Sequence, residues 1–253
     1  MADKIFHKLN KQNNNYFITN RIGFNPIGKI PDDLVIKAFE FAYQMTFGKT
    51  GEHRAYRSGG THQRKNGEIF ANAFQGKLAE FALFIVLSDN HIPVNEPDVN
   101  VFGLGTWDSV DLMIKNTNVS IKSTKSFGNL LLLEEKDWDK DAKYIPNDKG
   151  YDFTFLIRMN PYCEDILKRN KLLYSDDVSM ETLRNIIMSE IWNFDIPGYI
   201  TRDDLRNIIE NAYIIPQGAM LNGKMRMDAS NFYIQAGDMR SMEDFIKKNA
   251  INI

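Results

Sequence analysis

The segment 110–125 constrains the fold of this chain more than any other stretch. Two short runs of β-prone residues, 112–114 and 119–121, flank a polar turn of Lys, Asn, Thr and Asn. Such runs joined by a short polar turn predict a β-hairpin. The first strand opens with the carboxylate of Asp111 and the second carries the ammonium of Lys122. Pairing of the strands would bring these two groups near one another.

An acid beside a lysine on paired strands suits metal-assisted cleavage of a phosphodiester. The carboxylate offers oxygen ligands to a hard divalent cation, and the ammonium lies beside the attacking water and the phosphate. The pattern of Asp111 followed by Ser120-Ile121-Lys122 resembles the PD-(D/E)XK nuclease superfamily, which includes most type II restriction endonucleases. The resemblance implies an α/β fold with a mixed central sheet flanked by helices. It also implies Mg²⁺ as the metal and double-stranded DNA as the substrate.

Ser120 departs from the family pattern, which places a second acid two residues before the lysine. A hydroxyl is a poor substitute for a carboxylate as a Mg²⁺ ligand, so the missing charge must come from elsewhere. Some restriction enzymes with a Ser-x-Lys version take this acid from beyond the lysine strand. Glu134 and Glu135, which follow the apolar run 129–133, are candidates for such a displaced ligand. Each of them could equally be a solvated charge at the end of a strand.

Glu80 is the better-supported second acid. Apolar residues recur at helical spacing from 67 to 87, and Glu80 lies inside this apolar segment. An unpaired charge there would be costly to bury, so it needs a metal, a cation or water. Members of the resembled family often carry a glutamate on the helix before the hairpin. The alternative is a surface glutamate paired with Lys77, three positions earlier.

Asp108 competes with Asp111 as the acid of the hairpin. Three positions separate them, so on a strand they would point to opposite faces and only one could face the lysine. Asp111 directly precedes the apolar strand residues and is therefore preferred.

The expected roles of the site residues follow from this choice. Asp111 and Glu80 would hold the metal, with the carbonyl oxygen of Ile121 as a further ligand. Lys122 would position or help to deprotonate water and stabilise the charge on the phosphate. Ser120 could at most hydrogen-bond to water at the metal, and Lys125 could contact the phosphate.

Basic residues that could contact DNA occur in two places. The glycine-punctuated segment 49–65 is basic and poor in aliphatic residues, and its candidates are Arg54, Arg57, Arg64 and Lys65. In a later hairpin, 219–228, Lys224 and Arg226 alternate with Met225 and Met227, which predicts one basic and one packed face. An ordinary solvated loop and an edge hairpin protected by charges would give the same two patterns.

The rest of the chain indicates one nuclease domain over residues 1–253. A polar arm (1–20) precedes a helix from about 32 to 48, the catalytic core spans 66–160, and a helical and hairpin extension spans 161–253. Further strands are predicted at 129–133, 151–158 and 231–234, and further helices at 180–192, at 201–214 and from Ser241 onward.

Composition is compatible with this organisation. A hydrophobic fraction of 43% in 253 residues is ample for a core, and the formal charge of −2 excludes a generally basic nucleic-acid coat but not a local basic groove. The single cysteine, Cys163, suits a reducing cytoplasm, and no apolar segment indicates export or membrane insertion.

The sequence therefore predicts a type II restriction endonuclease, which by resemblance would act as a homodimer on a palindromic site. Two rivals remain open. One is a repair or recombination nuclease of the same fold, and the other is a non-catalytic DNA-binding module.

Overall fold

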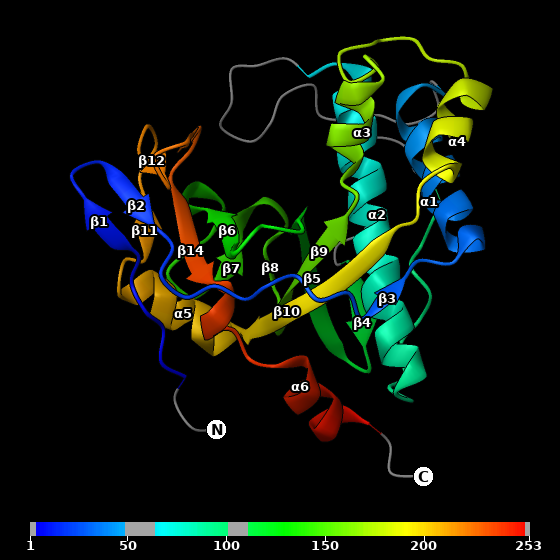
Figure 1. Cartoon of the computed structure of the whole chain (residues 1–253). Helices are drawn as coiled ribbons and strands as arrows, with labels where there is room; N and C mark the ends of the chain where they lie inside the picture. Colours follow the sequence, from blue (N-terminus) through cyan, green and yellow to red (C-terminus); the bar gives the residue numbers. More distant parts are fainter. Residues whose placement is uncertain (1–3, 49–63, 101–110, 251–253) are drawn as a thin grey trace.

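A computed structural model describes residues 4–48, 64–100 and 111–250, and its central element is a five-stranded mixed sheet (Figure 1). Its strands, in spatial order, are β3 (Gly28–Lys29), β10 (Asn193–Thr201), β9 (Phe153–Asn160), β5 (Thr117–Lys125) and β4 (Leu112–Ile114). Only β5 and β9 are parallel, and the other pairs are antiparallel. The predicted α/β class with a mixed sheet and flanking helices is thus confirmed.

Four helices gather on one side of this sheet (Figure 1). They are α1 (Asp32–Thr46), α2 (Asn66–Asp89), α3 (Cys163–Arg169) and α4 (Met180–Met188). Leu78 and Phe81 of α2 belong to the same buried cluster as Val119 and Ile121 of β5. By length and composition α2 could cross a membrane, but 61% of its most apolar window is buried inside the protein. Such burial is typical of the core helix of a soluble protein.

A second, smaller sheet covers the opposite face. Its strands, in order, are β11 (Ile214–Ile215), β14 (Asn231–Gln235) and β6 (Leu130–Glu134). Leu131 and Leu133 of β6 pack in one cluster with Leu156 of β9 and Ile200 of β10. The buried residues of α5 (Arg202–Glu210) complete this cluster. Strand β9 is therefore covered on both faces, since Phe155 and Ile157 pack in the cluster that contains α2 and Leu156 packs in the cluster that contains β6.

The N-terminal segment predicted as a polar arm contains a β-hairpin. Strands β1 (Asn10–Gln12) and β2 (Asn15–Phe17) pair with each other, and β2 runs parallel to β12 (Met220–Leu221) of the late hairpin. With β13 (Met225–Arg226), these strands form a four-stranded sheet in the order β1–β2–β12–β13. The remaining elements are β7 (Lys143–Tyr144), β8 (Lys149–Gly150), α6 (Met242–Asn249) and three 3₁₀ turns at Glu135–Asp137, Ile145–Asn147 and Ala236–Asp238.

Both predicted hairpins are observed. Lys115, between β4 and β5, has a φ of 56°, and Asn222 and Gly223, between β12 and β13, have φ values of 51° and 66°. Positive φ at the turn matches the twist of the flanking strands. Thr201 and Ser241 accept hydrogen bonds from the backbone at the starts of α5 and α6, as predicted for helix caps.

Strand β10 was not predicted from the sequence. The helix expected to reach Trp192 ends at Met188, and β10 follows at Asn193. Pro197 lies inside this strand, and proline normally argues against a central strand because it cannot donate to the ladder. Here the register shifts between Asp195 and Gly198, which accommodates the proline. A strand from the predicted C-terminal extension thus lies inside the main sheet.

Arg158 and Asp195 form a buried ion pair across β9 and β10. Arg158 is fully buried, and its Nε and Nη2 donate to the two Asp195 carboxylate oxygens at 2.8 and 2.6 Å. The remaining donors bond to the carbonyl oxygens of Ile22 at 2.7 Å and Gly23 at 2.8 Å. The pair therefore ties the segment before β3 to the central sheet.

Replacement of Arg158 by Ala should lower the free energy of unfolding by about 3–5 kcal/mol, because it leaves Asp195 buried without its partner. Arg169→Ala is the matched control, since its pairing with Glu190 leaves Arg169 66% exposed and should contribute less than about 1 kcal/mol. Urea denaturation of both variants measures the difference. Equal losses would contradict the importance of the buried pair.

Candidate functional site

The candidate site lies where β5 continues beyond its neighbour β4. Strand β4 pairs with β5 only over Thr117 to Val119, whereas β5 continues to Lys125. Within the described residues no strand pairs with β5 on this edge beyond Val119. This stretch of β5 from Ser120 onward, which has no strand partner on this side among the described residues, is its open edge.

Asp111 lies at the start of this open edge. Its backbone N–H donates to the Val119 carbonyl at 3.2 Å, and its Oδ2 accepts from the backbone N–H of Ile121 at 2.6 Å. Because the N–H and C=O of one strand residue point toward the same neighbour, the Ile121 carbonyl faces the same edge as the carboxylate. The predicted ligands Asp111 and Ile121 are therefore brought together.

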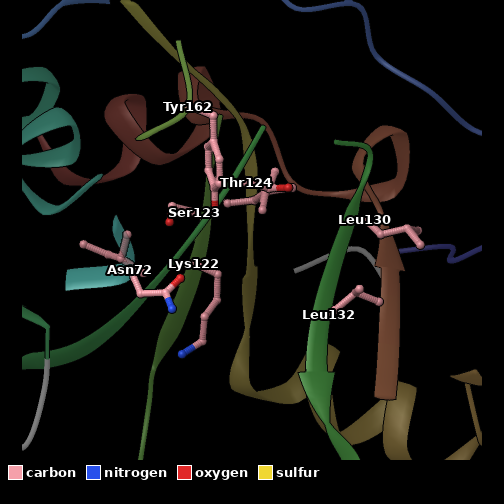
Figure 2. Close-up of a pocket in the computed structure, with 9 residues that line it drawn as sticks. Asn72, Lys122, Ser123, Thr124, Leu130, Leu132 and Tyr162 are labelled. Carbon is pink, nitrogen blue, oxygen red and sulfur yellow. The ribbon is translucent and has the colours of Figure 1, made fainter. Parts of the chain in front are cut away.

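Lys122 lines a cavity beside this edge. The cavity has a volume of about 370 Å³ and is lined by Asn72, Ile121, Lys122, Ser123, Thr124, Leu130, Leu132, Leu156 and Tyr162. In Figure 2 the Lys122 side chain extends into the same space as the amide of Asn72. The half-buried Lys122 ammonium has no hydrogen bond or ion pair within the described part of the chain. It is thus available to an anion that enters the cavity.

Asn72 and Tyr162 were not predicted as site residues. Asn72 lies on α2 eight residues before Glu80, so it shares a helical row with Gly76 and Glu80. That spacing could have revealed Asn72, whereas Tyr162 follows the end of β9 and carries no comparable signal in the sequence.

Glu80 forms the ion pair with Lys77 that the sequence left open. The two side chains lie 2.6 Å apart and are only 15% and 8% exposed. Lys77 also donates to the Asp98 carbonyl at 2.7 Å, and its ammonium lies 4.7 Å from the centre of the Phe41 ring. The charge on Glu80 thus has a cation beside it, which satisfies the requirement for a partner without a metal.

Helix α2 runs antiparallel to β5. In the first half of α2, Gln75 accepts from the backbone N–H of Cys163, which begins α3 after the end of β9. Lys125 at the C-terminal end of β5 pairs with Asp165 of the same short helix. Beyond its end, Val94 pairs with Ile114 beside the hairpin turn.

The direction of α2 indicates how Glu80 lies relative to the cavity. Glu80 is about 12 Å along the helix from Asn72, toward the hairpin turn. Asp111 is displaced from Lys122 in the same direction, because it bonds to Val119 and Ile121. A side-chain carbon at Gly76, between Asn72 and Glu80, would meet no atom of the described residues within 4 Å apart from the neighbouring helix backbone. Both acids thus lie on the hairpin side of the cavity, and the helical row has open space beside it.

Glu134 is oriented differently. Figure 2 shows the side chains of Leu130 and Leu132 directed away from Lys122, and Glu134 shares their face of β6 by strand alternation. Its carboxylate lies 3.5 Å from Lys136, and burial followed by the charge of Asp137 raises the pKa of Glu134.

Glu135 begins the 3₁₀ turn after β6, and its N–H donates to the Ser230 carbonyl. Within the described residues, neither of these acids forms a hydrogen bond or an ion pair with Lys122.

Ser120 lies on β5 between Val119 and Ile121, the two residues to which Asp111 bonds. It is only 1% exposed and pairs with Thr154 of β9. The expected role of Ser120, a hydrogen bond to water at the site, stays a prediction.

Of the residues predicted to contact DNA, some lie outside the described part of the chain and others form ion pairs with acids. Arg54 and Arg57 lie outside the described residues, and Arg64 precedes Lys65, the residue before α2. Lys65 pairs with Asp176 at 2.6 Å, and Lys125 pairs with Asp165 at 2.7 Å.

The late hairpin differs from its predicted pattern at one position. Lys224 and Arg226 are exposed as expected and Met227 is buried, but Met225 is 56% exposed. The expectation that both methionines form a packed face is therefore wrong, because β13 is an edge strand with nothing covering Met225 among the described residues.

The oxygen donors at this edge suit a hard cation only with additional ligands. Among the described residues no three His, Cys, Asp or Glu side chains lie together as a metal site. Magnesium, however, is commonly held by one or two carboxylates and keeps several waters. The carboxylate of Asp111 and the carbonyl of Ile121 fit that requirement, with Glu80 as the predicted source of a second charge.

Comparisons of the chain with protein-family models, with curated proteins and with solved structures found no match.

Proposed function

We propose that this protein is a Mg²⁺-dependent nuclease that hydrolyses phosphodiester bonds of double-stranded DNA. The observation that carries the proposal is the ammonium of Lys122, which lines a cavity beside Asp111 and has no hydrogen bond or ion pair among the described residues. The mixed sheet and the helix carrying Glu80 support the resemblance to the PD-(D/E)XK superfamily. Among members of that superfamily, a type II restriction endonuclease acting as a cytoplasmic homodimer fits best.

Each residue of the site has a separate role in the proposed reaction. In hydrolysis a water oxygen forms a bond to phosphorus, the bond to one ester oxygen breaks, and the proton lost by water is balanced by protonation of that leaving oxygen. Lys122 neutralises charge that develops on the phosphate and orients the water. Asp111, Glu80 and the Ile121 carbonyl would hold Mg²⁺, which when bound polarises the phosphate. The hydrogen bond from the Ile121 amide fixes the Asp111 carboxylate before any ligand binds.

Incubation of the purified protein with plasmid and phage DNA, with Mg²⁺ or with EDTA, tests the reaction. Discrete DNA fragments that form only with Mg²⁺ are expected. Cleavage that follows DNA structure instead of sequence would favour a repair or recombination nuclease. Binding without cleavage would favour a non-catalytic DNA-binding module.

Asp111→Asn should reduce cleavage by roughly a hundredfold or more while leaving the fold intact. The amide keeps an oxygen for the Ile121 N–H but removes the charge needed by the metal. Lys122→Ala should cause a similar loss, whereas Lys115→Asn in the hairpin turn should not, since asparagine tolerates positive φ. Single-turnover cleavage rates and melting temperatures of the three variants decide the outcome. Normal cleavage by folded Asp111→Asn would refute the assignment of this acid.

Glu80→Gln should impair Mg²⁺-supported cleavage about as severely as Asp111→Asn. Glutamine can still accept a hydrogen bond from Lys77, so the helix should remain folded. Glu134→Gln and Glu135→Gln provide matched controls and should cost little. Cleavage rates measured over a Mg²⁺ titration distinguish the three acids. If one of the two controls instead matches Asp111→Asn, the displaced acid follows the lysine strand.

A further inference from the structure

The sheet β1–β2–β12–β13 is built from two chain segments that contain no acidic residue. Neither residues 4–31 nor residues 211–227 include an Asp or Glu, although the whole chain has 33 of them and a formal charge of −2. The cations on or beside this sheet are Lys8, Lys11, Arg21, Lys224 and Arg226. The pairing of β2 with β12 brings the two segments together. Tertiary structure thus gathers positive charge that is dispersed in the sequence.

These five cations are exposed and are not neutralised by carboxylates. None of them forms an ion pair with a described residue. Their contacts are instead with neutral groups: Lys8 donates to the Asn211 carbonyl at 3.0 Å, and Arg21 donates to Asn222 Oδ1 at 3.2 Å. Lys11 lies 5.5 Å from the centre of the Tyr16 ring. By contrast, Lys65, Lys125 and several other surface cations of this protein are paired with acids.

The first hairpin of this sheet projects from the molecule. All three residues of β1 are exposed, whereas Tyr16 of β2 is only 7% exposed and anchors the hairpin. Hydrogen bonds from Met220 to the Asn14 carbonyl and from Asn222 to the Tyr16 carbonyl, both 2.9 Å, hold it in place. The hairpin is therefore rigidly attached, although its own side chains bury little surface.

The exposed residues of this hairpin are mainly amides. Asn10, Gln12 and Asn13 are exposed, and their side chains have no hydrogen bond within the described residues. An amide offers a donor and an acceptor together, which matches the edge of adenine in the major groove. A two-stranded ribbon also fits that groove, which is about 12 Å wide.

We propose that the sheet β1–β2–β12–β13 is a docking surface for duplex DNA, with the β1–β2 hairpin in the major groove. Lys11, Lys224 and the neighbouring cations contact phosphates, and Asn10, Gln12 and Asn13 contact base edges. The choice of DNA as the partner rests on the proposed function. The unneutralised charge of the sheet is independent of it and favours a polyanion.

The double variant Lys11→Ala/Lys224→Ala tests the phosphate contacts. Binding to a 30-base-pair duplex in EDTA should weaken by about tenfold, and the slope of log affinity against log salt should fall by about 1.8, because each phosphate contact contributes about 0.9. Lys247→Ala/Lys248→Ala is the matched control, since it removes two exposed charges from α6 and should change neither quantity. Melting temperatures confirm that both variants are folded.

The double variant Asn10→Ala/Gln12→Ala tests the base contacts. Selection of bound duplexes from a randomised library in EDTA should give a sequence motif for the wild type and a weaker motif for the variant.

Several outcomes would overturn the docking surface. One is that Lys11→Ala/Lys224→Ala binds DNA as tightly as the α6 control, and another is that Asn10→Ala/Gln12→Ala selects the same motif as the wild type. A third is that the variants change the oligomeric state, which would make this sheet an interface between copies of the chain. Binding in EDTA does not depend on cleavage. If the protein binds DNA but does not cut it with Mg²⁺, only the proposed function is contradicted. If Lys11→Ala/Lys224→Ala still cuts at specific sites as well as the wild type, only the docking surface is contradicted.

Discussion

The parallel pairing of β5 with β9 is the constraint on which the rest of the structure depends. The two strands pair from Val119 to Lys125 of β5, and parallel strands are normally covered by other layers of the fold. Helices α1 and α2 supply one cover, and the small sheet containing β6 supplies the other. Among the described residues, β4 begins at Leu112 and pairs with the second edge of β5 only as far as Val119, and the candidate site lies along the rest of that edge.

The position of that open edge explains why the candidate site combines rigidity with access. The Asp111 carboxylate is fixed by a hydrogen bond from the backbone of the strand it serves. Lys122 follows the buried residue Ile121 on β5, and its side chain lines the cavity. Functional groups placed on strands are positioned more precisely than groups on loops. The buried pair of Arg158 and Asp195 extends this rigidity to the segment before β3.

Local patterns predicted the elements that have strong periodicity or turn chemistry. The hairpin at 112–125, the apolar helix around Glu80, and the caps Thr201 and Ser241 could all be recognised because short-range interactions determine them. Strand β10 could not be recognised, since Pro197 breaks its pattern and only a shift in register with β9 accommodates it. The hairpin of β1 and β2 was also missed, because its polar residues lack the apolar alternation of a packed strand.

The sequence by itself determined that Asp111 lies beside β5, next to the residue that precedes Lys122, because a two-stranded hairpin with a short turn leaves little choice of register. It could not determine whether Glu80 pairs with Lys77, which of the three glutamates lies toward the cavity, or that Asn72 faces Lys122. Those relations depend on the direction in which α2 packs against β5 and on which face of β6 is turned inward. Likewise, the two acid-free segments are separated by about 180 residues in the chain, and only the pairing of β2 with β12 joins their charges into one surface. Contacts of this range are set by the packing of whole layers, for which a local pattern carries no information.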